Sequence, residues 1–336
     1  LWFALYIFRW PVWREHHPSY LLLTHAVLIS LLVPKLWLGG TEILEMLRQG
    51  IQWLLTRSEQ RASIPRRTFI TRSGQAMAGV LLGAFAYGMT RGRYGYHVRR
   101  HDVPIPGLPE GLEGLRIVQI SDAHLGSFLE DFEPVERGLK LIQSLEPDIL
   151  CFTGDLVNDH SDEAEPWISR FQSLTARYGK FSILGNHDYA DYARRTDEER
   201  DNVRRRIREI HGEMGFDLLL DEHRYIERGG DKVLIAGVQN WGKGFRQSGD
   251  LDAALKGAQV DLPTVLLSHD PTHWEERVMG EKAPVELTLS GHTHGMQMGL
   301  EIPALGIKIS PSKLRYKRWG GLYTEGTQHL HVNRGF

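Results

Sequence analysis

Two histidines stand one residue apart at the end of an apolar run, in the stretch LSGHTHGMQM (289–298). Imidazole binds divalent metals through a neutral ring nitrogen. Glycines flank His292 and His294 on both sides, and glycine lets the backbone turn tightly and lets another group approach closely. The stretch therefore predicts either a metal-binding pair at the end of a strand or a polar turn that binds nothing.

Four other apolar runs also break into turns that carry potential metal ligands. They are LRIVQISDAHLG (115–126), DILCFTGDLVND (148–159), KFSILGNHDY (180–189) and PTVLLSHDP (263–271). Short apolar runs that stop at Gly, Ser or Asp are typical of buried strands. Together with the first stretch, these runs give the candidate ligands Asp122, His124, Asp155, Asn186, His269, His292 and His294.

Helical patterns separate these runs, over residues 134–146, 163–177, 197–214 and 250–257. Strands that alternate with helices predict an α/β fold. Ligands of such sheets bind outside the carboxyl ends of the strands. We therefore expect the side chains from all five runs to surround one crevice.

This set of candidate ligands is too large for one ion. Two ions that share a carboxylate use such a set, and two-metal sites stabilise the attacking and leaving oxygens of phosphoryl transfer. Mixed nitrogen and oxygen donors favour Mn, Fe, Zn or Co over Mg or Ca. The only cysteine, Cys151, lies inside an apolar run, which excludes a Cys-based zinc site. The prediction is a site for two divalent metal ions.

In order, the motifs DxH, GDxxN, GNHD, SH and GHTHG resemble the signature of the calcineurin-like metallophosphoesterases. They are most similar to the bacterial membrane-linked branch that includes YkuE, YaeI and some UDP-2,3-diacylglucosamine diphosphatases. The resemblance covers about residues 100–336. It implies a four-layer α/β/β/α sandwich around a dinuclear metal centre.

The resemblance also implies a role for each ligand. Asp155 would bridge the two ions. The first ion would also be held by Asp122, His124 and His294. The second would also be held by Asn186, His269 and His292. A metal-bound hydroxide would attack phosphorus, and His187 would stabilise the phosphoryl oxygen or protonate the leaving oxygen.

Asn158 departs from the family pattern. Many relatives carry Asp at this position, where the carboxylate orients the catalytic histidine, and an amide cannot raise the basicity of an imidazole in the same way. We place Asn158 with His187 in the catalytic group, and Asp159 or Asp188 could supply the carboxylate instead. The alternative for His187 is a structural hydrogen bond beside the site.

The first hundred residues differ from the rest in charge and hydropathy. They hold 13 Lys and Arg and 4 Glu, a net charge of +9, whereas residues 101–336 hold 27 basic and 38 acidic residues, a net charge of −11. The runs 18–34 and 74–89 contain no Asp, Glu, Lys or Arg. Uncharged runs with basic flanks and tryptophans predict membrane association. We expect residues 1–91 to be a helical membrane-anchoring region, with a soluble helical domain as the alternative.

Three further features define the expected organisation. PRRTFITRSGQ (65–75) resembles a twin-arginine export signal, which would attach the protein to a bacterial inner membrane with residues beyond 90 on the extracytoplasmic side. Residues 92–114 would form a linker with an edge strand around 96–103. The metallophosphoesterase domain would cover 115–336, and it would be truncated because the family continues past HLHVNRGF with another strand.

The prediction is a membrane-anchored phosphohydrolase that cleaves phosphomonoesters, phosphodiesters or a pyrophosphate bond. The anchor favours a lipid-linked phosphate ester as substrate. The alternatives are a UDP-2,3-diacylglucosamine diphosphatase-like enzyme of lipid A synthesis and a non-catalytic metal-binding scaffold. The acidic second part argues against nucleic acid as a partner. A basic segment, KLRYKRWGGLY (313–323), predicts either a phosphate or headgroup contact or an exposed hairpin.

Overall fold

The computed structural model describes residues 18–56, 64–128, 132–259, 261–280, 282–297, 300–302 and 307–336. The opening stretch LWFALYIFRW, which suggests the end of a helix, lies outside these residues. The chain divides into two compact units, Leu1–His97 and Val98–Phe336.

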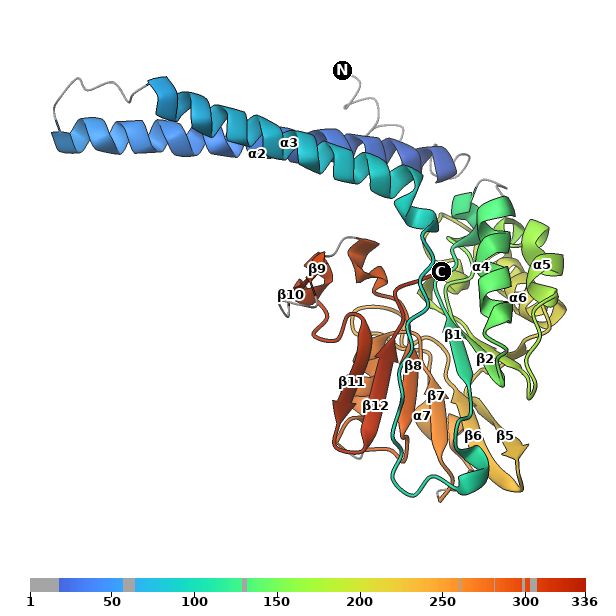
Figure 1. The fold of residues 1–336 in the computed structure, drawn as a ribbon. Coiled ribbons are helices and arrows are strands. Elements are labelled where there is room, and N and C mark those ends of the chain that lie inside the picture. Colours follow the sequence, from blue (N-terminus) through green and yellow to red (C-terminus); the bar gives the residue numbers. More distant parts are fainter. Residues whose placement is uncertain are drawn as a thin grey trace. The chain divides into compact units, whose positions relative to one another are not determined.

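Two long helices form the first unit, α2 (Pro18–Thr56) and α3 (Ile64–Thr90), and they pack along each other (Figure 1). Gly74 and Ala78 of α3 are buried, and a Cβ on Gly74 would lie 3.2 Å from Oγ1 of Thr41 in α2. Small residues four positions apart let two helices approach closely.

The uncharged runs 18–34 and 74–89, from which we expect a membrane anchor, fall within these two helices. Among the described residues, no helix combines the length and the apolar character that crossing a bilayer requires. The uncharged runs are 17 and 16 residues long, and a spanning helix needs about 20 apolar residues. Membrane-spanning helices are therefore not supported. Large apolar side chains on both helices are nevertheless exposed, among them Leu31, Leu32, Leu36, Ile43, Leu44, Leu47, Ile51 and Val80.

The second unit is built on two sheets. The first contains the parallel strands β1 (Ile117–Ile120), β2 (Ile149–Thr153), β3 (Lys180–Ile183) and β4 (Asp217–Leu218). In spatial order, the second contains β11 (Gly321–Glu325), β12 (Gln328–Val332), β8 (Leu287–Ser290), β7 (Thr264–Leu267), β6 (Asp231–Gly237) and β5 (Glu222–Arg228). Its four central strands are parallel, and the edge strands β5 and β11 are antiparallel to their neighbours. The predicted α/β fold with parallel sheets is confirmed.

One hydrophobic core joins the two sheets. Ile149, Cys151 and Phe181 of the first sheet belong to the same buried cluster as Val265 and Leu289 of the second. Cys151 is completely buried, and burial raises the pKa of its thiol to about 12. The cysteine therefore remains a protonated, apolar core residue.

Helices cover the outer faces of the sheets. The first sheet is covered by α4 (Phe132–Ser144), α5 (Ile168–Gln172) and α6 (Asp197–Glu213) (Figure 1). A second cluster joins the other sheet to α7 (Leu251–Ala254) and to the π-helical turn Trp274–Val278, which follows α8 (Pro271–His273). The helix predicted over 163–177 is shorter, because two 3₁₀ turns, Ser161–Glu163 and Glu165–Trp167, precede α5.

Short elements connect the sheets near the ends of the strands. The 3₁₀ turns are η3 (Leu125–Phe128), η6 (Asn186–Tyr189), η8 (His294–Gln297) and η10 (Pro311–Leu314). A two-stranded ribbon pairs β9 (Leu300–Ile302) with β10 (Ile307–Ile309). The last residues of the basic segment 313–323 enter β11, which forms an antiparallel hairpin with β12, and its first residues, 313–315, are exposed.

The edge strand predicted around 96–103 is wrong. No strand lies between the turns η1 (Gly92–Tyr94) and η2 (Glu110–Leu112). The three prolines directly after this range, between positions 104 and 109, cannot donate backbone hydrogen bonds, so they prevent a strand from continuing there. The segment instead packs Val103 and Leu108 on the core, and Nε2 of His329 lies 2.9 Å from the carbonyl of Pro104.

A buried histidine gives this unit a stability that depends on pH. Nδ1 of His211, on α6, lies 3.0 Å from Oγ of Ser182, and burial lowers the pKa of the imidazole from 6.5 to about 4. The unfolded chain therefore takes up this proton more readily than the folded protein. The contribution is complete above pH 6.5 and is lost as the pH falls toward 4.

Between about pH 7 and about pH 5, the free energy of unfolding of the wild type should fall. We expect the fall in His211→Gln to be about 2 kcal/mol smaller. Gln keeps a polar group near Ser182 and does not titrate. Urea denaturation at both pH values measures the difference. Equal losses in the two proteins would contradict this account.

Candidate metal centre

The predicted ligands lie on turns that directly follow five parallel strands. These turns follow β1, β2, β3, β7 and β8. They carry, in that order, Asp122 and His124, then Asp155, Asn186 and His269, and last His292 and His294.

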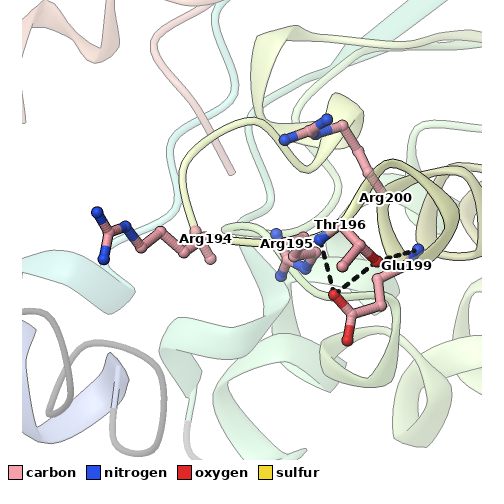
Figure 2. A pocket seen from close by; sticks show the side chains of 6 residues that line it. Arg194, Arg195, Thr196, Glu199 and Arg200 are labelled. Carbon is pink, nitrogen blue, oxygen red and sulfur yellow. Dashed lines mark hydrogen bonds between the residues drawn. The ribbon is translucent and has the colours of Figure 1, made fainter.

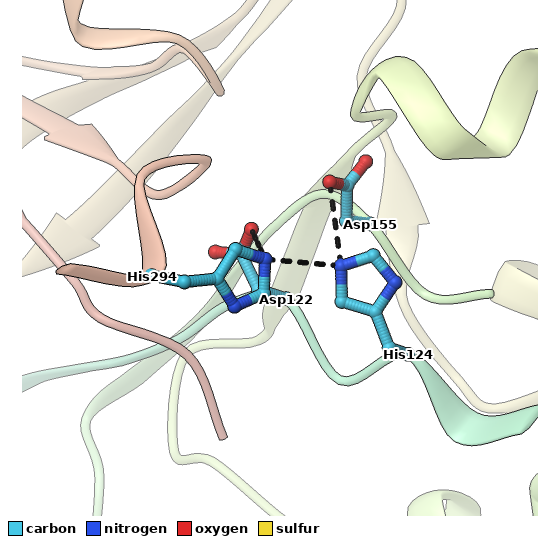
Figure 3. Close-up of side chains that lie close together, drawn as sticks. All are labelled: Asp122, His124, Asp155 and His294. Atoms are coloured by element: carbon cyan, nitrogen blue, oxygen red, sulfur yellow. Dashed lines mark hydrogen bonds and ion pairs between the residues drawn. The ribbon is translucent and has the colours of Figure 1, made fainter. Parts of the chain in front are cut away.

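Four of these side chains gather around one point (Figure 3). Asp122, His124, Asp155 and His294 each offer one donor atom, and these atoms all lie within 4.8 Å of one another. Nε2 of His124 is 3.1 Å from Nε2 of His294. Nε2 of His294 is 3.2 Å from Oδ1 of Asp122. Three separate turns therefore converge on one position.

A second group shares one member with the first. Donor atoms of Asp155, His269 and His292 also lie within 4.8 Å of one another. Nε2 of His269 is 3.2 Å from Oδ2 of Asp155 and 3.3 Å from Nδ1 of His292. Oδ1 of Asn186 joins this group, 2.7 Å from Nδ1 of His292. The Asp155 carboxylate thus lies between the two groups, where a bridging ligand would lie.

The donor set fits divalent metal ions. Asp122, Asp155 and His269 are at most 3% exposed, and buried carboxylates and imidazoles require a partner. The donors are imidazole nitrogens and carboxylate or amide oxygens without a thiolate, which suits Mn, Fe, Zn or Co. The hydrogen bonding of His269 also fits, because its Nδ1 donates to the carbonyl of Thr153 at 2.7 Å, so Nε2, beside Asp155, is the nitrogen that can exchange its proton for a cation.

Protonation in this cluster favours cation binding. Burial opposes ionisation of Asp122, but the adjacent His294 lowers its pKa to about 2. Burial lowers the pKa of both His124 and His292 to about 4, so both rings are neutral at pH 7. Burial also works against protonation of His269, but Asp155 raises its pKa to about 10. A cation that binds there displaces the proton of His269.

The ligand turns adopt an unusual backbone conformation. Eight non-glycine residues among those described have positive φ, and this region costs free energy for residues with a side chain. Five of the eight are candidate ligands: Asp122 (54°), His124 (43°), Asp155 (60°), His292 (71°) and His294 (49°). Such a concentration is typical of a functional site.

Glycines next to these turns make room for the ligands. A Cβ on Gly291 would overlap Oγ of Ser121 and Oδ2 of Asp122, and a Cβ on Gly185 would overlap Oδ1 of Asp155. Gly291 therefore lets one ligand turn lie directly against another, as its position in the GHTHG motif suggests.

His187 lies beside the cluster. Its Nδ1 lies 2.6 Å from the backbone carbonyl of Asn158, which can only accept, so Nδ1 carries the hydrogen. The ring stacks on Tyr192, with centroids 4.4 Å apart, and lines a cleft of about 260 Å³ together with Asp155 and Asn186. This arrangement leaves Nε2 as the nitrogen that is available to a substrate.

The orientation of His187 differs from the sequence-based expectation. The side chain of Asn158 bonds to Ser127 instead, and only its backbone carbonyl meets the imidazole. Neither proposed carboxylate substitutes for it. Asp159 accepts a hydrogen bond from Arg195 at 2.7 Å, and buried Asp188 accepts from four backbone N–H groups of the neighbouring turns. A backbone carbonyl can orient the ring whatever side chain stands at position 158.

The cleft also contains residues that the sequence analysis missed. Tyr192, Phe245, Arg315 and Tyr316 line it beside the candidate ligands. Only the basic segment 313–323 gave a signal for part of this group. Arg315 and Tyr316 lie in this segment, whereas Tyr192 and Phe245 gave no signal, because they belong to loops without a recognisable motif.

Asp270 makes a second contact behind the cluster. It caps the helix α8 through Oδ1, which accepts from the backbone N–H of Thr272 at 2.8 Å. Its Oδ2 is buried without a hydrogen-bond partner among the described residues and lies 3.4 Å from Nε2 of His292. A carboxylate behind a metal-binding imidazole fixes the ring and increases its basicity.

Comparison with known proteins places this geometry in a family. Residues 115–296 match the family model described as calcineurin-like phosphoesterase. The chain belongs to this family. Its metallophosphoesterase domain is that of a hydrolase, and the family explains why two groups of ligands share a carboxylate.

Three relatives show how far the similarity extends. Bacillus subtilis YkuE, described as an uncharacterized metallophosphoesterase, is 30% identical over 80% of this chain and 90% of its own length. The UDP-2,3-diacylglucosamine pyrophosphatase LpxG of Chlamydia trachomatis is 30% identical over 67% of this chain and 78% of its own. A zebrafish (Danio rerio) transmembrane protein with a metallophosphoesterase domain is 29% identical over 59% of this chain, and the match spans only 44% of that longer protein.

We expect Asp270→Asn to weaken binding of the ion held by His292 by about 10- to 100-fold. Asn still caps α8, but it lacks the negative charge behind the imidazole. Metal titration against a chelator measures the affinity. The matched control is Thr272→Val, which removes the hydroxyl bonded to Asp270 Oδ1 and leaves Oδ2 in place. Equal weakening in both variants would show that the hydrogen bonds at Oδ1, and not the charge behind the imidazole, determine the affinity.

Proposed function

We propose that this protein is a membrane-associated phosphohydrolase that cleaves phosphate esters or diphosphates at a site for two divalent ions. The observation that supports it most is the Asp155 carboxylate, which belongs to both ligand groups beside a cleft. Family membership supplies the class of reaction.

When bound, two divalent ions would activate water and stabilise negative charge on the phosphoryl oxygens. Asp155 would contact both ions. The first would also be held by Asp122, His124 and His294, and the second by Asn186, His269 and His292. Mn, Fe, Zn and Co suit these donors.

His187 would act on the substrate through Nε2. Its Nδ1 hydrogen is held by the carbonyl of Asn158, so the ring keeps one orientation while Nε2 faces the cleft. In its protonated form the imidazole would donate a hydrogen bond to a phosphoryl oxygen or a proton to the leaving oxygen. Asn158 would contribute to catalysis through its backbone.

A lipid-linked substrate is favoured by two observations. Two Chlamydia relatives carry the name UDP-2,3-diacylglucosamine pyrophosphatase, and the first unit exposes many large apolar side chains. Exposed apolar surface of this extent marks a contact with a partner or a membrane. A diphosphatase of this type is the second candidate function, and residues 1–91 would attach it to the extracytoplasmic side of a bacterial inner membrane.

We expect substitution of the exposed apolar face of α2 to release the protein from membranes. Leu36, Ile43 and Leu47 are exposed and spaced by seven and four residues, which places them on one helix face. The triple substitution to Lys should move the protein from the pelleted to the soluble fraction, because the apolar face no longer enters the interface. Leu314→Lys, at another exposed apolar residue, is the control. Unchanged pelleting of the triple variant would exclude this attachment.

We expect the protein to hydrolyse bis(p-nitrophenyl) phosphate with added Mn²⁺, and His187→Ala to lower kcat by about 100- to 10,000-fold. Metal content should stay the same, because His187 is not among the ligands. His223→Ala is the control, since this imidazole bonds to the carbonyl of Ala254 on another part of the domain. Release of p-nitrophenol and metal analysis provide the two measurements. No hydrolysis with any of the four metals would favour a non-catalytic scaffold.

A further inference from the structure

One cation at the cleft has no carboxylate partner among the residues that the structure describes. Arg315 lines the cleft, and its Nη2 donates to the carbonyl of Lys243 at 3.3 Å. No ion pair of Arg315 occurs within the described ranges. Two neighbouring basic residues do form ion pairs. Arg318 pairs with Glu275 at 2.9 Å, and Lys243 pairs with Glu276 at 3.3 Å.

Aromatic rings hold this guanidinium in place. Its central carbon lies 5.1 Å from the ring centroid of Phe245 and 5.7 Å from that of Tyr316. Both rings also contact His292: the centroids of Phe245 and His292 are 4.7 Å apart, and the hydroxyl of Tyr316 lies 2.8 Å from Nε2 of His292. Arg315 is therefore attached to the same side chains that surround a candidate ligand.

These contacts limit the distance between Arg315 and the candidate metal centre. Because 5.1 Å and 4.7 Å add to 9.8 Å, the guanidinium carbon lies at most 9.8 Å from the ring centre of His292. A second phosphate, joined to the reacting phosphorus through one oxygen, can lie between Arg315 and His292. Arginine binds phosphate with paired, charge-assisted hydrogen bonds, and the aromatic rings reduce the number of orientations it can adopt.

A second hollow with basic residues has its charges largely paired. It has a volume of about 530 Å³ at the start of α6 and contains Arg194, Arg195 and Arg200 (Figure 2). Arg195 pairs with Asp159 at 2.7 Å and Arg200 with Asp197 at 2.6 Å, so most of its charge is neutralised. Arg194 extends away from the other side chains (Figure 2). The unpaired charge that shares a cleft with the ligands is therefore that of Arg315.

We propose that Arg315 binds a second phosphate of the substrate, next to the one that reacts, and so selects diphosphate diesters over esters with a single phosphate. This inference rests on the proposed function and specifies its substrate class. Water adds to the reacting phosphorus, and the bond to the bridging oxygen breaks. The leaving phosphate monoester keeps the electron pair, stays paired with Arg315, and each product takes one proton of the water.

The test compares two substrates that differ by one phosphate, bis(p-nitrophenyl) phosphate and P1,P2-di(p-nitrophenyl) diphosphate. The full chain is assayed with Mn²⁺ and the products are separated by chromatography. We expect Arg315→Ala to lower kcat/KM for the diphosphate by roughly 10- to 100-fold, as the loss of a hydrogen bond to a charged group predicts. For the monophosphate diester, kcat/KM should change by less than about threefold, because that substrate has no second phosphate to pair with Arg315. Lys313→Ala is the matched control, since it removes an exposed charge of the same segment that does not line the cleft.

The outcomes separate the two proposals. Equal losses of kcat/KM for both substrates in Arg315→Ala would overturn the role of Arg315. The same holds if the wild type hydrolyses the monophosphate diester but does not cleave the diphosphate. Neither outcome would contradict the proposed phosphohydrolase activity. Failure of the wild type to hydrolyse either substrate would overturn both. A selective loss that Lys313→Ala also produces would assign the effect to the charge of the segment rather than to Arg315.

Discussion

The catalytic unit depends on one electrostatic constraint, the burial of the Asp155 carboxylate among imidazoles from other strands. Asp155 is 1% exposed, and the desolvation of its charge is opposed by His269, whose positive charge lowers the pKa of the carboxyl group well below its usual range. A buried carboxylate of this kind is stable only with opposite charge beside it. The two sheets therefore have to pack so that the ends of their strands lie close to the same point.

The backbone conformation that brings the ligands together costs free energy. Five candidate ligands have positive φ, and two neighbouring glycines leave no room for a side chain. These costs are offset by the core between the sheets, which holds both sets of strands. Buried Asp188 adds a polar connection, because its two oxygens accept hydrogen bonds from the backbone of both the β2 and the β3 turns. These hydrogen bonds connect the β2 and β3 turns directly to each other.

The two units of the chain use apolar residues in opposite ways. In the second unit the large apolar side chains are mostly buried between sheets and helices. In the first unit many of the large apolar side chains that the structure describes are exposed on the two helices, and Gly74 and Ala78 of α3 are buried. This contrast, together with the opposite net charges of the two parts, agrees with different surroundings for each.

The sequence by itself determined the types of the ligands and the strands that carry them. Each motif is local, and the carboxyl ends of parallel strands in one sheet meet at one edge, so Asp122 and Asp155 could be grouped without coordinates. The packing of the two sheets decided that His292, which follows a strand of the second sheet, joins them. Tertiary structure decided which atom orients His187, why Asp270 faces His292, and that Arg315 reaches the cleft. It also excluded the strand around 96–103. These features depend on side-chain directions and on contacts between distant loops, and such contacts leave no periodic pattern in the chain.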